Sequence, residues 1–205
     1  MNFLLLVTIS CLCLAVAELL ARRYRLDPSL TRRIVHVGTS LVAVAAPFFV
    51  SREELLIACL AFVVLMLFSK HRTLLTSVHN VSRHTFGEIY LPLGVFLTAY
   101  AFLPHHLTAY LFGILVLGLG DALAGFVGER RGRHSFNVFG AARSIEGSAA
   151  LLCVTLALFV WLLPERLLWA APVSILIVLA EAVTVRGTDN LVLPLLAGGV
   201  VWLFA

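Results

Sequence analysis

The chain consists almost entirely of long apolar stretches joined by short polar connections. About 20 apolar residues in a helix cross the hydrocarbon core of a bilayer. Hydrophobic residues make up 61% of the 205 residues and charged residues only 13%, whereas soluble domains are about 45–50% apolar and about 25% charged. This excess excludes a soluble enzyme, a disordered tail and a disulfide-stapled secreted module. We therefore expect an all-α, polytopic bundle of membrane helices.

Eight apolar runs are candidates for these helices. We expect them to form one integral membrane domain over 1–205, with seven spans as the alternative count. The second and third runs are short for a span, so we expect them to be tilted or partly re-entrant. The runs lie at 2–21, 35–50, 54–68, 87–103, 107–128, 147–163, 167–183 and 189–205.

Positive charges are concentrated on alternate connections. Of the fifteen Lys and Arg residues, only Arg52 and Arg166 fall on the other set of connections. The positive-inside rule assigns the basic set to the cytoplasm, which places the N-terminus and the C-terminus outside. We expect an integral protein of a bacterial or archaeal cytoplasmic membrane. The basic set comprises Arg22, Arg23, Arg25, Arg32, Arg33, Lys70, Arg72, Arg83, Arg130, Arg131, Arg133, Arg143 and Arg186.

The net charge of +4 does not indicate nucleic-acid binding. The basic residues are divided among short loops beside the membrane, where topology and anionic lipid headgroups already account for them. Membrane lipids, and no nucleic acid, are therefore the expected surroundings.

Six acidic residues fall within or at the ends of apolar runs, all toward the expected cytoplasmic side. An ionisable group in a membrane helix costs a few kcal/mol or more and usually marks a site. Six acids near arginine-rich loops predict one polar cavity that opens to the cytoplasm. The alternative is a set of independent acid–arginine pairs at helix ends, which is favoured for Glu18 with Arg22 four residues later. The six are Glu18, Glu88, Asp121, Glu146, Glu181 and Asp189.

Asp121 has the most informative surroundings of the six. Gly118, Asp121, Gly125 and Gly128 are spaced by three, four and three residues, so they share one face of a helix. Small residues at this spacing can also mediate close helix packing, but such packing needs no carboxylate. A small face around an acid would instead let a phosphate group or a metal ion approach the backbone.

Helix starts supply further candidates. Ser144 can cap the sixth helix, and Glu146 suits the positive end of its dipole. Helix N-termini also bind phosphate, and Arg143 precedes this one. Asp189 and Asn190 open the last helix, for which a simple cap is the alternative interpretation. No Walker A, GxSxG or HExxH motif occurs, so phosphate chemistry would use carboxylate-bound Mg²⁺ and basic side chains.

Five sequence pieces, in this order, resemble the CTP-dependent polyprenol kinase family, which includes dolichol kinase, phytol kinase and the CTP-dependent diacylglycerol kinase of yeasts. The resemblance implies transfer of the γ-phosphoryl group of CTP to a lipid alcohol, with Mg²⁺, at a cytoplasm-facing site. The family often has a lysine before the Ser-x-Glu-Gly piece, where Arg143 is the nearest equivalent here. Because 133–142 is also atypical, CTP and other nucleotides both stay open as donors. The pieces are Arg32–His36, Gly87–Pro92, Gly120–Ala122 with Gly125 and Gly128, Ser144–Ser148, and Glu181 with Asp189–Pro194.

The candidate residues divide by expected role. The expected catalytic residues are Asp121, Glu88 and Glu146, and either Asp121 or Glu88 would accept the hydroxyl proton. The metal-region acids are Asp121 and Asp189. The expected nucleotide-binding residues are Arg143, Ser144, Gly125, Gly128, Arg33, His36 and Asn190.

Two other functions compete with the kinase. One is a CTP:lipid nucleotidyltransferase similar to phosphatidate cytidylyltransferases, which carry a similar Gly-Asp-Ala helix. The other is a small transporter coupled to protons or cations, for which acids would be distributed across both leaflets or near broken helices at the midplane. The acids here lie toward one side, which counts against transport.

Overall fold

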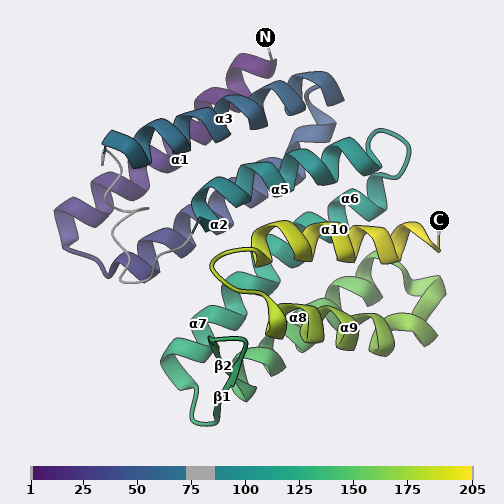
Figure 1. Ribbon diagram of the computed structural model, residues 1–205. Helices are drawn as coiled ribbons and strands as arrows, with labels where there is room; N and C mark the ends of the chain where they lie inside the picture. Colours follow the sequence, from purple (N-terminus) through teal and green to yellow (C-terminus); the bar gives the residue numbers. More distant parts are fainter. Residues whose placement is uncertain (1, 73–85, 205) are drawn as a thin grey trace.

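The computed structural model describes residues 2–72 and 86–204, and it is helical except for one short hairpin (Figure 1). Each of the eight apolar runs contains a helix, which confirms a helical membrane protein. Their bounds are α1 (Asn2–Tyr24), α2 (Pro28–Ala45), α3 (Arg52–Arg72), α5 (Gly87–Phe102), α6 (Leu107–Leu115) continuing into α7 (Ala122–Arg131), α8 (Ile145–Leu162), α9 (Ala170–Val183) and α10 (Asp189–Trp202).

Five helical segments in the described part of the chain are long and apolar enough to cross a membrane. The expectation of a short third helix is wrong, because α3 reaches this length. By contrast, α5 and α10 have only 16 and 14 residues. The five segments are Asn2–Tyr24, Arg52–His71, Leu107–Arg131, Ile145–Leu162 and Pro164–Val183, the last of which joins the 3₁₀ segment η3 (Pro164–Trp169) to α9.

The second helix begins earlier than its apolar run. Asp27 accepts a hydrogen bond of 2.8 Å from the N–H of Ser29 and so caps α2. Pro28 occupies the first helical turn, where its missing N–H has no cost. The apolar pattern misses this start because Arg32 and Arg33 interrupt it. The helix then gives way to a 3₁₀ turn, η1 (Ala46–Phe48).

Between α6 and α7 the helix widens into the π-helical segment η2 (Val116–Asp121). The segment lies within one long apolar helix, Leu107–Arg131. Single-turn π segments inside α-helices are frequent at functional sites. Asp121, the last residue of η2, therefore lies where the helical repeat changes.

The centre of the bundle is formed by α10 packed against α5 and α6. Small residues allow the close approach: a Cβ on Gly113 would collide with the carbonyl oxygen of Pro194, and one on Gly94 with that of Asn190. Tyr110 and Phe112 are fully buried beside these contacts. Such glycine-mediated packing fixes the start of α10 against α5.

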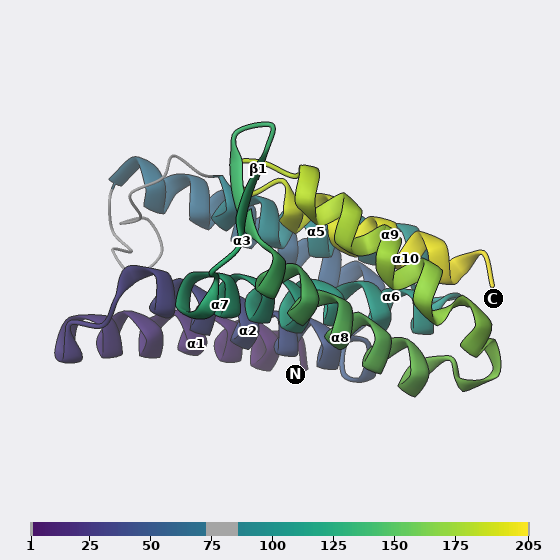
Figure 2. The same cartoon turned by 90° about the horizontal axis from the view of Figure 1, so that it is seen from below.

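A two-stranded antiparallel hairpin links α7 to α8. Its strands are β1 (Ser135–Val138) and β2 (Ala141–Ser144), with Val138 opposite Ala141. The two turn residues, Phe139 and Gly140, have φ values of 48° and 83°, as a type I′ turn requires. The hairpin extends away from the helices, as Figure 2 shows.

The connections of the bundle gather at two ends. The α1–α2, α7–α8 and α9–α10 connections lie at one end, and the α2–α3, α5–α6 and α8–α9 turns lie toward the other, with the C-terminus (Figure 1). The first end carries the basic residues of these loops. Arg83, also expected there, lies outside the described residues.

Candidate active site

Arg143 at the end of the hairpin joins the C-terminus of α9 to the N-terminus of α10. Its guanidinium forms an ion pair of 2.7 Å with Glu181 and a longer one of 3.5 Å with Asp189. It also donates hydrogen bonds to the main-chain oxygens of Glu181 and Thr184. Glu181 is only 3% exposed, and a buried carboxylate requires a paired charge. Arg143 supplies that charge.

Asp121 completes what we call the acid–arginine cluster: Asp121, Glu181, Asp189 and Arg143. The carboxylate of Asp121 interacts electrostatically with Asp189, Glu181, Arg143 and Arg33. With none of the described residues does it form a hydrogen bond or an ion pair. Its oxygens are therefore not committed to any group in the described part of the chain, although charges of both signs are close.

Arg33 of α2 lies across the glycine face of α7. It donates a hydrogen bond of 3.1 Å to the carbonyl of Ala122 and pairs with Glu129 at 2.5 Å. A Cβ on Gly125 would collide with the guanidinium of Arg33. The small face beside Asp121 thus makes room for a basic group.

Gly128 faces the start of α8. A Cβ there would lie 3.0 Å from Oγ of Ser144. Ser144 caps α8 as expected, accepting a hydrogen bond of 3.1 Å from the N–H of Gly147. Because Gly128 packs on this cap, α7 and α8 are in close contact at the same end as the acid–arginine cluster.

Glu146 lies apart from the other acids. It binds Nδ1 of His134 at 2.8 Å and also accepts from the backbone N–H of His134 at 3.3 Å. These contacts hold the base of the hairpin on the first turn of α8. The described geometry gives Glu146 a role in placing the hairpin, and its predicted catalytic role stays a prediction.

The first turn of α10 connects the acid–arginine cluster to α5. The side-chain amide of Asn190 donates a hydrogen bond of 2.7 Å to the carbonyl of Gly87. Its backbone N–H contacts Asp189 Oδ1 at 3.0 Å. Asn190 is buried, whereas Asp189 is half-buried beside Arg143. The two neighbours thus face opposite sides of the turn.

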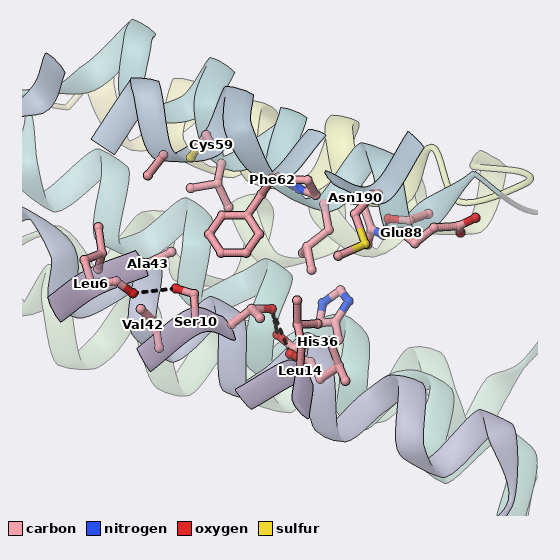
Figure 3. A pocket seen from close by; sticks show the side chains of 18 of the residues that line it. Leu6, Ser10, Leu14, His36, Val42, Ala43, Cys59, Phe62, Glu88 and Asn190 are labelled. Atoms are coloured by element: carbon pink, nitrogen blue, oxygen red, sulfur yellow. Dashed lines mark hydrogen bonds between the residues drawn. The ribbon is translucent and has the colours of Figure 1, made fainter. Parts of the chain in front are cut away.

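His36 of α2 and Glu88 of α5 line the polar end, or mouth, of an apolar pocket (Figure 3). Nε2 of His36 is 2.9 Å from the carbonyl oxygen of Leu117 in the π-helical segment. Glu88 is 8% exposed and forms an ion pair of 2.7 Å with Lys70. His36 is near the acid–arginine cluster, since it contacts η2 and interacts electrostatically with Asp189.

The structure divides the six membrane acids, which were expected in one cavity. Three lie in the acid–arginine cluster, Glu88 borders the pocket, and Glu146 binds His134. Glu18 pairs with Arg22 at 2.7 Å, as the helix-end alternative predicts. The sequence placed Glu181 among the acids of the expected cavity and in the last piece of the family resemblance, and Lys70 in the basic set, but it assigned neither a site role. The sequence contains no signal for their partners.

The acid–arginine cluster offers carboxylates of the kind that bind Mg²⁺. Within the described residues, no three His, Cys, Asp or Glu side chains are close enough together to hold a metal ion. Mg²⁺ is usually held by one or two carboxylates together with substrate phosphates and water. The uncommitted carboxylate of Asp121, with Asp189 nearby, fits this mode of binding. In this mode the phosphate groups of a substrate supply the remaining ligands.

Comparison with known proteins identifies the family. No protein-family model and no solved structure matches the chain. Among curated proteins it is similar to a phytol kinase from Synechocystis sp., with 31% identity over 199 residues that cover 91% of this chain and 84% of the relative. The chain belongs to the polyprenol and phytol kinase family. This membership confirms the resemblance that the motifs indicate, and the match extends over nearly the whole bundle.

Proposed function

We propose that this protein is a membrane-embedded kinase that transfers the terminal phosphoryl group of a nucleoside triphosphate, CTP first among them, to the hydroxyl of a lipid alcohol. The observation that carries the proposal is the acid–arginine cluster in a chain 31% identical to a phytol kinase. Phosphoryl transfer depends mainly on positioning and charge neutralisation, and the cluster offers groups for both.

The proposed topology has eight spans, with the active site facing the cytoplasm and both termini outside. The alternation of basic and weakly charged connections supports this orientation. The placement of the cluster supports it too, because Arg143 and Asp189 belong to connections at the basic end. The N-terminal ends of the shorter helices α5 and α10 would lie at the inner membrane surface, beside the site.

Residue roles follow from the contacts. Asp121 and Asp189 would hold Mg²⁺, which when bound neutralises charge on the phosphate oxygens. Arg143 and Arg33 would face the phosphates, since arginine matches their geometry with a planar set of donors. Gly125, Gly128 and Ser144 would shape the nucleotide side by bringing α2, α7 and α8 together.

In the proposed reaction the alcohol oxygen attacks the terminal phosphorus atom. The bond between that phosphorus and the bridging oxygen breaks, which gives a lipid monophosphate, a nucleoside diphosphate and one proton. Glu88 or Asp121 accepts the proton. Glu88 lines the pocket and is paired with Lys70, so a hydroxyl that arrives from the apolar side would meet this carboxylate–ammonium pair.

The test is a direct assay of the purified protein in detergent. CTP labelled in the γ-phosphate is incubated with Mg²⁺ and phytol, farnesol, undecaprenol, dolichol or diacylglycerol, and parallel reactions contain ATP, GTP or UTP. Label in a lipid phosphate supports the kinase. Release of labelled pyrophosphate, with CMP retained on the lipid, would replace it with a nucleotidyltransferase.

A further inference from the structure

An apolar pocket opens between α1, α2, α3 and α5, beside the acid–arginine cluster (Figure 3). Its cavity volume is about 100 Å³, and it is partly open to the outside. Its lining is mostly apolar with a few polar groups, as is typical of small-molecule sites. We call it the tail pocket, and the residues that line it come almost entirely from these four helices.

Polarity changes along the tail pocket. Its mouth is lined by Arg32, His36, Glu88 and Asn190. In Figure 3 the side chains of His36, Glu88 and Asn190 lie at one end of the pocket. The opposite end is formed by apolar and small residues, with Phe62 between the two ends. The residues at that far end include Leu6, Val42, Ala43 and Cys59.

The length of the tail pocket corresponds to one leaflet. Arg32 at the mouth and Ala43 at the far end are eleven residues apart on α2, which is about 16 Å at 1.5 Å per residue. The hydrocarbon core of a bilayer is about 30 Å thick. A hydrocarbon chain lying in the pocket would therefore extend from the inner surface to about the midplane.

The mouth adjoins the acid–arginine cluster. Asn190 lines the pocket, and its backbone N–H is 3.0 Å from Asp189. His36 interacts electrostatically with Asp189 and binds the carbonyl of Leu117, four residues before Asp121. A hydroxyl group at the mouth would thus be next to the carboxylates that face the nucleotide in the proposed function.

We infer that the tail pocket binds the hydrocarbon chain of a single-chain lipid alcohol, with its hydroxyl at Glu88, His36 and Asn190 and its tail end at Cys59. This inference rests on the proposed function for the identity of the substrate. The mouth favours a neutral hydroxyl, because a buried carboxylate and an amide can accept from and donate to it. The apolar side chains at the far end, among them Cys59, would limit the length of the chain that fits.

Shortening the pocket tests the inference. Cys59→Phe fills the far end, so KM for phytol should rise about 10-fold, since a change in an apolar pocket of this size is worth about that much. KM for the shorter geraniol should stay unchanged. The matched control is Cys153→Phe, at an exposed position on α8 outside the pocket. An equal rise of KM for both alcohols, or no rise for phytol, would overturn the inference.

A binding measurement without nucleotide separates this inference from the proposed function. A farnesol analogue with a photoreactive group at its tail end is cross-linked to the unmodified protein, and the labelled peptide is identified. Label between Leu55 and Phe62 or between Leu6 and Leu14, removed by excess phytol, supports the pocket even if no kinase activity is found. Label on α8 or α9 in an active enzyme, or label removed by phosphatidylglycerol but not by phytol, contradicts it.

Discussion

The acid–arginine cluster and the tail pocket are built from different kinds of contact. The cluster joins η2, β2, α9 and α10 through individual charged groups, of which Arg143 makes the most contacts. The pocket is lined by continuous faces of four helices, to which many side chains each contribute a little. Single substitutions in the cluster should therefore have large effects on the reaction rate. Single substitutions in the pocket should change the preference for alcohols of a given chain length.

The largest effect is expected at Arg143. Arg143→Met leaves Glu181 buried without its guanidinium, and breaking a buried pair costs about 3–5 kcal/mol. We expect a large fall in Tm in detergent and loss of activity. The double variant Arg143→Met with Glu181→Met should recover most of the Tm but none of the activity. Recovery of activity in the double variant would show that Arg143 acts only in stability.

Asp121 should come next. Asp121→Asn keeps the size of the side chain but removes its charge, so kcat should fall by about 10²–10³-fold, as for other lost groups that stabilise transition-state charge. The measurement is initial rate against nucleotide and alcohol concentration. Asp27→Asn is the control, because Asn also caps helices. Equal kcat in the two variants would remove Asp121 from the reaction.

Glu88 connects the two regions. Glu88→Gln should lower kcat by about 10²-fold if this carboxylate accepts the hydroxyl proton, with the KM for nucleotide unchanged. Glu54→Gln, at the start of α3 beside Ser51, is the matched control. An unchanged kcat for Glu88→Gln would assign proton acceptance to Asp121.

A smaller effect is expected at Asn190. Asn190→Ala removes the hydrogen bond of 2.7 Å to the carbonyl of Gly87, which costs about 0.5–1.5 kcal/mol. Because this residue adjoins both regions, KM should rise for the alcohol and for the nucleotide together. A rise confined to one substrate would mean that the two regions are independent.

The smallest effect is expected at Glu18, outside both regions. Its ion pair with Arg22 joins residues four apart on one helix, and such pairs contribute about 0.3–0.5 kcal/mol. Glu18→Gln should change neither kcat nor KM and should lower Tm only slightly. A clear loss of activity would instead show that Glu18 contributes to function.

The sequence predicted the helices well because apolar runs determine them directly. It also predicted the cap at Ser144, which depends only on local residue types. It missed the hairpin, since Phe139-Gly140 is not one of the usual Asn-Gly or Asp-Gly signals of a two-residue turn. The π-helical segment was also missed, because nothing in an apolar run marks a change of helical repeat.

The partners of the charged residues could not be predicted, because they depend on tertiary contacts. Arg143 and Glu181 are 38 residues apart in sequence, and no periodicity relates them. The tail pocket was missed for the same reason: its lining residues have the pattern of ordinary membrane helices, and only their packing leaves space between them. The sequence could single out candidate acids, but their distribution among the cluster, the pocket and the hairpin required the fold.

The first turn of α10 has a thermodynamic consequence. Asp189 faces the charged groups while Asn190, its neighbour, holds α5 at the pocket mouth. If nucleotide binding shifts this turn, the affinity for the alcohol changes by some factor, and the alcohol must change the affinity for nucleotide by the same factor. Binding of a nucleotide from water and of an alcohol from the lipid phase would thus be coupled through the peptide bond between Asp189 and Asn190.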